Sequence, residues 1–276
     1  MGLTIHYGVS SSTKSTKRAM HYVERMRQLA MDIPFEEVGE LIVIDYPPEH
    51  KDVKDEALGA MLIDASKYVT FPVGHTTWSE HKSITCRPSH FMGFNIVPGP
   101  GSEWASFGLC SYPKVIRYKQ YDIPTKLGGW RWGSFCKTQY ASNPACGGLP
   151  NFLRCHIGII TLLDRIAELP TMKIYVDDEG EYARSNYTDN WRVQNPVYTW
   201  HEGKYDPKAL AEEVGDWNNM IAGMSGALSD ALGSMNSELH LKSQITQFPD
   251  FEQLEFKGSQ NKDLDTFLKV MEQLVA

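Results

Sequence analysis

The residues best suited to bind a ligand are concentrated in residues 128–140, a stretch rich in glycine, aromatic and basic residues. Aromatic planes beside a guanidinium group suit stacking on a flat ligand, and an arginine can hold a carboxylate or phosphate through two parallel hydrogen bonds. The alternative is a buried connector in which the tryptophans fill core and the glycines make turns. The predicted binding residues for a small anionic or aromatic ligand are Trp130, Arg131, Trp132, Lys137, Gln139, Tyr140 and His6.

The same region holds residue types that bind zinc. Cys136, Cys146, Cys155 and His156 lie within about twenty residues of one another, and four such ligands would close a structural zinc site. Their spacing does not match the short-range zinc patterns, because no two cysteines are separated by two residues. Three separate buried thiols are therefore the alternative interpretation.

Cys136 is also a candidate nucleophile, with His156 as the second candidate catalytic residue. A reactive thiolate needs an electropositive and partly exposed setting, which Arg131, Lys137 and His156 could provide. An exposed thiol with a low pKa would favour this hypothesis, and an inert, fully buried one would count against it.

Three other polar groups resemble known sites less well. Residues 8–15 resemble a phosphate-binding loop, but Thr13 stands where the pattern requires a second glycine, so a serine- and threonine-rich helix cap is the better interpretation. His75, Glu80 and His81, with His90 nearby, lack the spacing of a helical zinc motif. We expect the acidic group Asp177, Asp178, Glu179 and Glu181 to form an exposed turn.

The periodicity of apolar residues indicates the elements that must position these side chains. Alternation over residues 3–9 predicts a half-buried strand, and helical spacing predicts a helix that ends near residue 31. The apolar run 38–46 predicts a central strand. Further helices are predicted at 55–69, 150–169, 206–232 and 264–274, and further strands at 92–97, 115–118, 172–176, 181–183 and 197–200, with long loops between residues 70 and 150.

This order of elements predicts an α+β fold: a mixed or antiparallel sheet opened by a strand–helix–strand unit, with helices packed mainly on one face. Residues 1–235 are expected to form one domain and residues 236–276 a C-terminal extension with a short helix.

Composition narrows the class of function. The chain has 276 residues and a net charge of −7, which disfavours generic nucleic-acid binding because such binding needs a surplus of lysine and arginine. No stretch approaches the ~18 apolar residues of a membrane span, and residues 1–7 lack the pattern of a secretion signal. Five cysteines, an odd number, in a chain of this length indicate reduced thiols in a cytoplasm.

Several strings in the chain resemble a family of uncharacterised bacterial proteins. They are GWRWGSFCKTQYA at 129–141, NFLRCH at 151–156, DEGEY at 178–182, the opening seven residues and residues 217–222. The resemblance implies a bacterial cytoplasmic setting and assigns no catalytic residue.

The leading hypothesis is therefore a cytoplasmic enzyme or small-molecule-binding protein whose pocket is lined by residues 130–140. The alternatives are a non-enzymatic interaction, defence or regulatory protein whose aromatic loops bind a partner, and a domain stabilised by structural zinc.

Overall fold

An antiparallel sheet forms the centre of the protein. The computed structural model describes residues 3–45, 65–73, 80–119, 121–179, 207–234 and 243–260. Within these residues the sheet has seven strands in the order β11-β1-β10-β7-β6-β2, with β3 also paired to β6. The strands are β1 (Thr4–Ser11), β2 (Glu37–Val38), β3 (Ile42–Asp45), β6 (His90–Val97), β7 (Ala105–Ser111), β10 (Trp130–Lys137) and β11 (Met172–Asp178).

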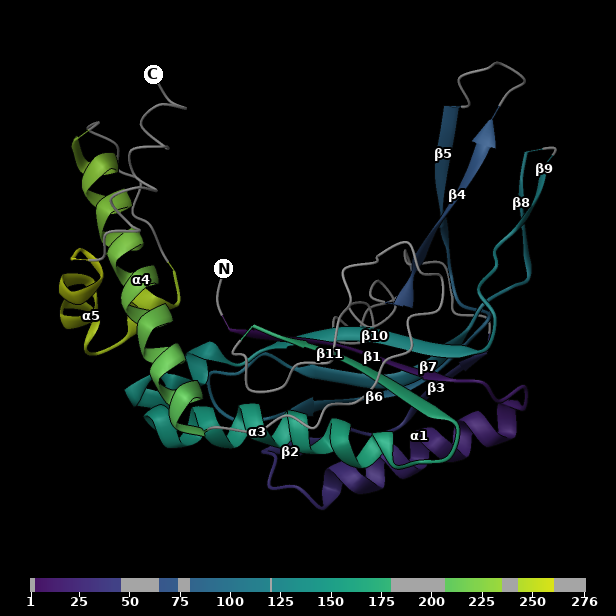
Figure 1. The fold of residues 1–276 in the computed structure, drawn as a ribbon, viewed down its shortest axis with the longest axis horizontal. Coiled ribbons are helices and arrows are strands. Elements are labelled where there is room, and N and C mark those ends of the chain that lie inside the picture. Colours follow the sequence, from purple (N-terminus) through teal and green to yellow (C-terminus); the bar gives the residue numbers. More distant parts are fainter. Residues whose placement is uncertain are drawn as a thin grey trace.

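Two helices cover one face of this sheet, α1 (Thr16–Met31) and α3 (Gly148–Ala167) (Figure 1). Ser15 caps α1 by accepting a hydrogen bond from the backbone N–H of Arg18, which satisfies one of the free donors of the first turn. The buried residues of α3 include Phe152, Ile159 and Leu163, as the helical spacing predicts.

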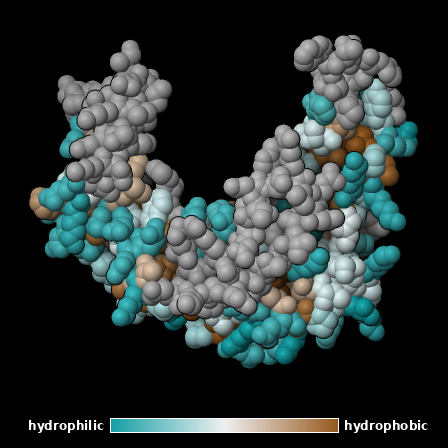
Figure 2. Space-filling model, viewed as in Figure 1, coloured by the Kyte–Doolittle hydropathy of each residue, from teal (hydrophilic) through white to brown (hydrophobic). Residues whose placement is uncertain are grey.

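Two arms rise from opposite ends of the sheet, on the side away from α1 and α3 (Figure 1). One arm consists of the hairpins β4 (Lys67–Val73) with β5 (Glu80–Cys86) and β8 (Val115–Tyr118) with β9 (Tyr121–Pro124). The other arm is α4 (Pro207–Ser234), which packs against α5 (Phe251–Gly258). The same two arms stand apart in the space-filling view of Figure 2.

The described residues form two apolar clusters, one in the sheet with its helices and one in the α4 arm. The large core lies within the sheet and its helices and includes Leu210 and Val214 from the start of α4. A small second cluster holds Ala222, Ile245 and Phe248, so α4 belongs to both clusters. Residues 243–260 therefore pack on α4, while the predicted helix at 264–274 lies outside the described residues.

The predicted fold class, α+β with an antiparallel sheet and a strand–helix–strand opening, is confirmed. The prediction of a central strand at 38–46 is wrong, because β2 and β3 are short strands that pair only with β6 at the sheet edge. Their residues alternate between half-buried and exposed, and Val43 is 44% exposed.

Two further predictions differ from the structure. Residues 130–137 were expected in a loop but form β10 near the middle of the sheet, because Trp130, Trp132 and Cys136 alternate with more exposed residues. The end of the helix predicted at 55–69 falls in strand β4. The strands predicted at 181–183 and 197–200 lie outside the described residues.

No helix among the residues that the structure describes is long and apolar enough to cross a membrane.

Candidate functional site

The sheet has two unlike faces, and the strand register decides which side chains lie on each. Ile5 lies opposite Cys136 on β10 and Asp178 on β11, and Asp178 contacts α3, so these residues lie on the face that the helices cover, the helix face. His6, Phe135 and their alternate neighbours lie on the opposite side, the open face.

On the helix face, His156 sits in a buried chain of hydrogen bonds. Its Nδ1 is 2.8 Å from Thr138 Oγ1, and its Nε2 is 3.1 Å from Asp178 Oδ2. All three residues are buried, so the chain satisfies polar groups inside the core rather than meeting a ligand. The predicted catalytic role of His156 is not supported, and Asp178 is not part of an exposed acidic turn.

Cys136 is equally inaccessible. Its thiol donates to the carbonyl of Glu103 at 3.3 Å, and burial raises its pKa to about 12. Burial likewise raises the pKa of the Cys155 thiol to about 11, against a smaller opposing effect of Arg154. The proposed nucleophile therefore has a protonated, enclosed thiol, the opposite of the setting that thiolate chemistry needs.

The four predicted zinc ligands do not come together in the described part of the chain. Cys136, Cys146, Cys155 and His156 all lie in described segments, and no three histidine, cysteine or acidic residues gather there as a group that could hold a metal ion. His156 already uses both ring nitrogens in hydrogen bonds, and all five cysteines are free thiols.

Three of the predicted ligand-binding side chains are structural. Trp130 and Trp132 are buried, and the Trp132 indole donates to the carbonyl of Ser106 at 2.8 Å. Gln139 is also buried, where its oxygen accepts from the Leu3 N–H and its nitrogen donates to Asn218 of α4. These buried side chains fix the sheet and α4 through their own hydrogen bonds.

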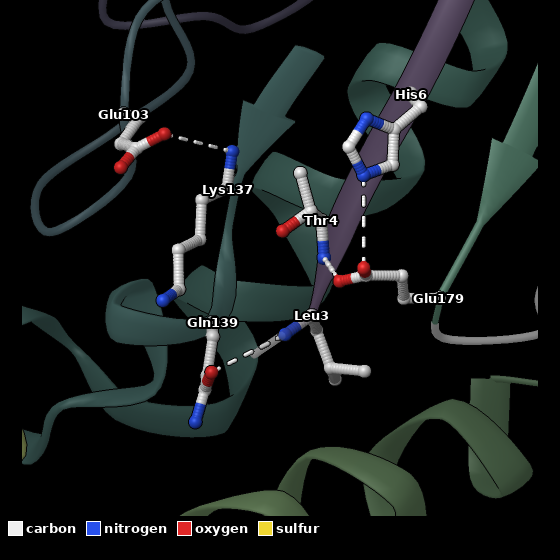
Figure 3. A network of polar contacts seen from close by, with 7 residues as sticks. All are labelled: Leu3, Thr4, His6, Glu103, Lys137, Gln139 and Glu179. Carbon is white, nitrogen blue, oxygen red and sulfur yellow. Dashed lines mark hydrogen bonds and ion pairs between the residues drawn. The ribbon is translucent and has the colours of Figure 1, made fainter. Parts of the chain in front are cut away.

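The open face holds His6, an accessible imidazole. Its Nε2 lies 3.6 Å from Glu179 Oε1, and the two side chains are 45% and 41% exposed. The other oxygen of Glu179 accepts from the Thr4 N–H at 3.0 Å, which fixes the carboxylate beside the imidazole (Figure 3). Phe135 lies directly opposite His6 on β10, with 6.0 Å between the ring centroids, and is 46% exposed.

Lys137 adds a cation to the same face, two residues beyond Phe135. Its Nζ lies 4.6 Å from the centre of the Tyr140 ring and 3.4 Å from the Tyr140 hydroxyl. Its backbone N–H donates to the carboxylate of Glu103 (Figure 3). Lys137 lies opposite Thr4, so it is a diagonal neighbour of His6.

Arg131 also lies on the open face, toward the hairpin arm. It is opposite Ser10 on β1 and Cys110 on β7, and its Nη2 donates to the carbonyl of Gly128 at 3.0 Å. The structure therefore brings four predicted residues to the open face, His6, Arg131 and Lys137 directly and Tyr140 through its contact with Lys137.

Sequence reasoning missed the two residues that flank His6. Phe135 was not singled out within its segment, although alternation along β10 could have placed it beside Arg131 and Lys137. Glu179 was assigned to an exposed turn, and no local pattern links it to a histidine in the first strand.

The fold and site together define an α+β protein whose antiparallel sheet has one covered face and one face bearing polar and charged side chains. The chain matches no known protein-family model, no curated protein and no solved structure.

Proposed function

We propose that this protein binds a small anionic ligand with an aromatic part on the open face, where His6 can transfer a proton. The observation that carries the proposal is the grouping of His6, Phe135 and Lys137 on that face, with His6 held beside Glu179. An imidazole, an exposed ring and an ammonium group are complementary to an aromatic acid.

Each side chain has a distinct role in this proposal. The exposed Phe135 ring stacks on the flat part of the ligand, and Lys137 attracts the anionic group. Glu179 orients the His6 ring, as the acidic partner of a general acid or base does. The site thus supports acid–base chemistry, without a role for Cys136 or His156.

The proposal includes a bacterial cytoplasmic setting. The five free cysteines support it, because thiols persist in reducing compartments, as does the resemblance of residues 129–141 and 151–156 to a bacterial family.

The test uses benzoate as a minimal aromatic acid. Wild-type protein is titrated with benzoate while the ring signals of His6 are followed by nuclear magnetic resonance and assigned with a His6→Gln variant. We expect saturable binding that moves the His6 signals, and roughly tenfold weaker binding in Lys137→Gln and Phe135→Ala. The control Lys17→Gln removes an exposed lysine from α1 and leaves binding unchanged. Shifts of the His6 signals that grow linearly with benzoate concentration, without saturation, would contradict the proposal.

A second candidate role, binding a protein partner, is favoured by the hairpin arm. Its exposed hydrophobic side chains include Tyr68, Val115 and Tyr121, which are 79%, 50% and 47% exposed. Figure 2 shows hydrophobic residues gathered on this arm. Exposed aromatic side chains on a projecting arm are available to contact a partner, and aromatic residues are enriched at interfaces.

Self-association through this arm can be tested by sedimentation. A monomer–dimer equilibrium in the wild type that is weakened in Tyr68→Ser and Tyr121→Ser would support this role. A monomer at every concentration would exclude self-association through the hairpins.

A further inference from the structure

Arg131 has an unused donor inside the protein. Its Nε is buried and has no hydrogen-bond partner, while its Nη2 donates only to a backbone carbonyl, that of Gly128. A guanidinium group has five N–H donors, and a buried donor without a partner costs free energy. None of the ion pairs found between described residues involves Arg131.

A second cation lies beside it. Lys67, the first residue of β4, places its Nζ 3.7 Å from the position that a Cβ atom would occupy on Gly133. Gly133 is two residues from Arg131 on the same strand and face, a separation of about 7 Å. The ammonium group therefore lies over the same part of the open face as the guanidinium group, and within the described segments Lys67 also has no ion-pair partner.

Two neighbouring acidic groups among the described residues, the Cys110 thiol and the Tyr112 hydroxyl, do not neutralise these charges. Burial raises the pKa of the Cys110 thiol, although Lys67 acts in the opposite direction. Burial also raises the pKa of the Tyr112 hydroxyl, and Arg131 opposes this shift only in part. Both groups are therefore neutral at physiological pH, and an anion between the two cations would supply the missing counter-charge.

The strands beneath this pair carry no side chain at two facing positions. Gly8 and Gly133 lie opposite each other across β1 and β10, and neither has a positive φ. A Cβ atom would approach no heavy atom closer than 3.6 Å at Gly8 or 3.7 Å at Gly133, which are ordinary contacts. Neither backbone conformation nor close packing requires glycine here, and a strand glycine without such a need is typical of a place where another group approaches the backbone.

We propose that Arg131 and Lys67 form an anion-binding site of the phosphate class above the Gly8–Gly133 floor. Arg131 supplies a planar fork of donors, and Lys67 supplies a compact point charge. His6 lies opposite Phe135, four residues along β10 from Arg131, a distance of about 13 Å. A ligand anchored by a phosphate at Arg131 thus reaches His6 with its other end. This last step rests on the proposed function, whereas the anion site does not.

The test is calorimetric titration of the full chain with inorganic phosphate at pH 8, where the dianion predominates. We expect saturable binding of one phosphate per chain. Arg131→Gln and Lys67→Gln should each weaken it roughly tenfold or more, because each removes a charge-assisted interaction. The matched controls Arg18→Gln and Lys17→Gln remove exposed cations from α1 and should bind as the wild type does.

Two outcomes would overturn the site: no saturable binding by the wild type, or unchanged binding in the folded Lys67→Gln variant. Phosphate binding by Lys67→Gln tests the site even if Arg131→Gln fails to fold, since Lys67 is a partly exposed hairpin residue whose substitution leaves the core intact. His6→Gln separates the two proposals, because it should impair benzoate binding and leave phosphate binding intact.

Discussion

At the scale of single residues, one position along β10 separates a buried thiol from an accessible ammonium group. Cys136 faces the helices and its neighbour Lys137 faces the open side, because successive strand side chains point to opposite faces. The same rule separates the structural Trp132 from Arg131. Chemical type alone therefore does not distinguish the residues that can meet a ligand from those that hold the sheet.

Burial of Cys136 predicts a loss of stability at alkaline pH. Its pKa rises from 9.0 to about 12 on folding, so its contribution is complete below pH 9 and is lost as the pH rises toward 12. Between pH 8 and 10 we expect the free energy of unfolding to fall by about 1 kcal/mol more in the wild type than in Cys136→Ala. Urea unfolding at pH 8, 9 and 10 measures this difference.

The control for this experiment is Cys146→Ala, which removes a partly exposed thiol outside the sheet. Its pH dependence should follow that of the wild type. If the free energy of unfolding fell equally with pH in Cys136→Ala and in the wild type, folding would not raise the pKa of the Cys136 thiol.

At the scale of elements, glycine plays two different roles in neighbouring strands. A Cβ atom on Gly108 of β7 would lie 2.5 Å from the Met92 carbonyl oxygen of β6, closer than real atoms approach. A Cβ atom on Gly133 of β10 would meet the Tyr7 carbonyl oxygen only at 3.8 Å. The β6–β7 pair requires its glycine, whereas β10 does not.

Alanine substitutions should separate these two roles. Gly108→Ala should destabilise the protein by about 1–3 kcal/mol, because the backbone of β6 must move. Gly133→Ala should fold with stability within about 1 kcal/mol of the wild type. Thermal and urea unfolding of both variants measure this contrast. Similar losses of stability in the two variants would show that the space around Gly108 and Gly133 does not differ.

At the scale of the whole molecule, a small polar network joins the sheet to the α4 arm. The Gln139 side chain accepts from the backbone N–H of Leu3, the residue before β1, and donates to Asn218 of α4. Asn218 in turn donates to Ser142. Leu210 and Val214 of α4 belong to the large core, while Ala222 belongs to the second cluster. The network therefore lies where the two clusters meet.

Removing this network should loosen the α4 arm more than the sheet. Gln139→Leu leaves buried polar partners unsatisfied, with an expected cost of about 1–3 kcal/mol. Hydrogen exchange followed by mass spectrometry should show faster exchange in α4 and α5 and little change in β6 and β7. Gln28→Leu, on an exposed position of α1, is the control. Faster exchange throughout the sheet as well would indicate that the sheet and the α4 arm unfold as one cooperative unit.

The local features of this protein could be predicted from its sequence. Alternation along residues 3–9 and 172–176 and the apolar stripe of residues 150–169 predicted β1, β11 and α3, because these periods follow from backbone geometry. The same alternation is present in residues 130–137 but was interpreted as a loop, since glycine and aromatic residues also suit a binding loop. The α+β class followed from the order of elements alone.

Contacts between residues far apart in the chain could not be predicted from the sequence. The pairing of Asp178 with His156, of Glu179 with His6, and of Lys67 with the β10 floor joins segments 22, 173 and 66 residues apart (178 − 156, 179 − 6 and 133 − 67). No local period encodes such contacts, because they depend on strand order and register. Strand order placed His6 between β10 and β11, and this neighbourhood makes His6 a candidate for chemistry while enclosing Cys136 and His156.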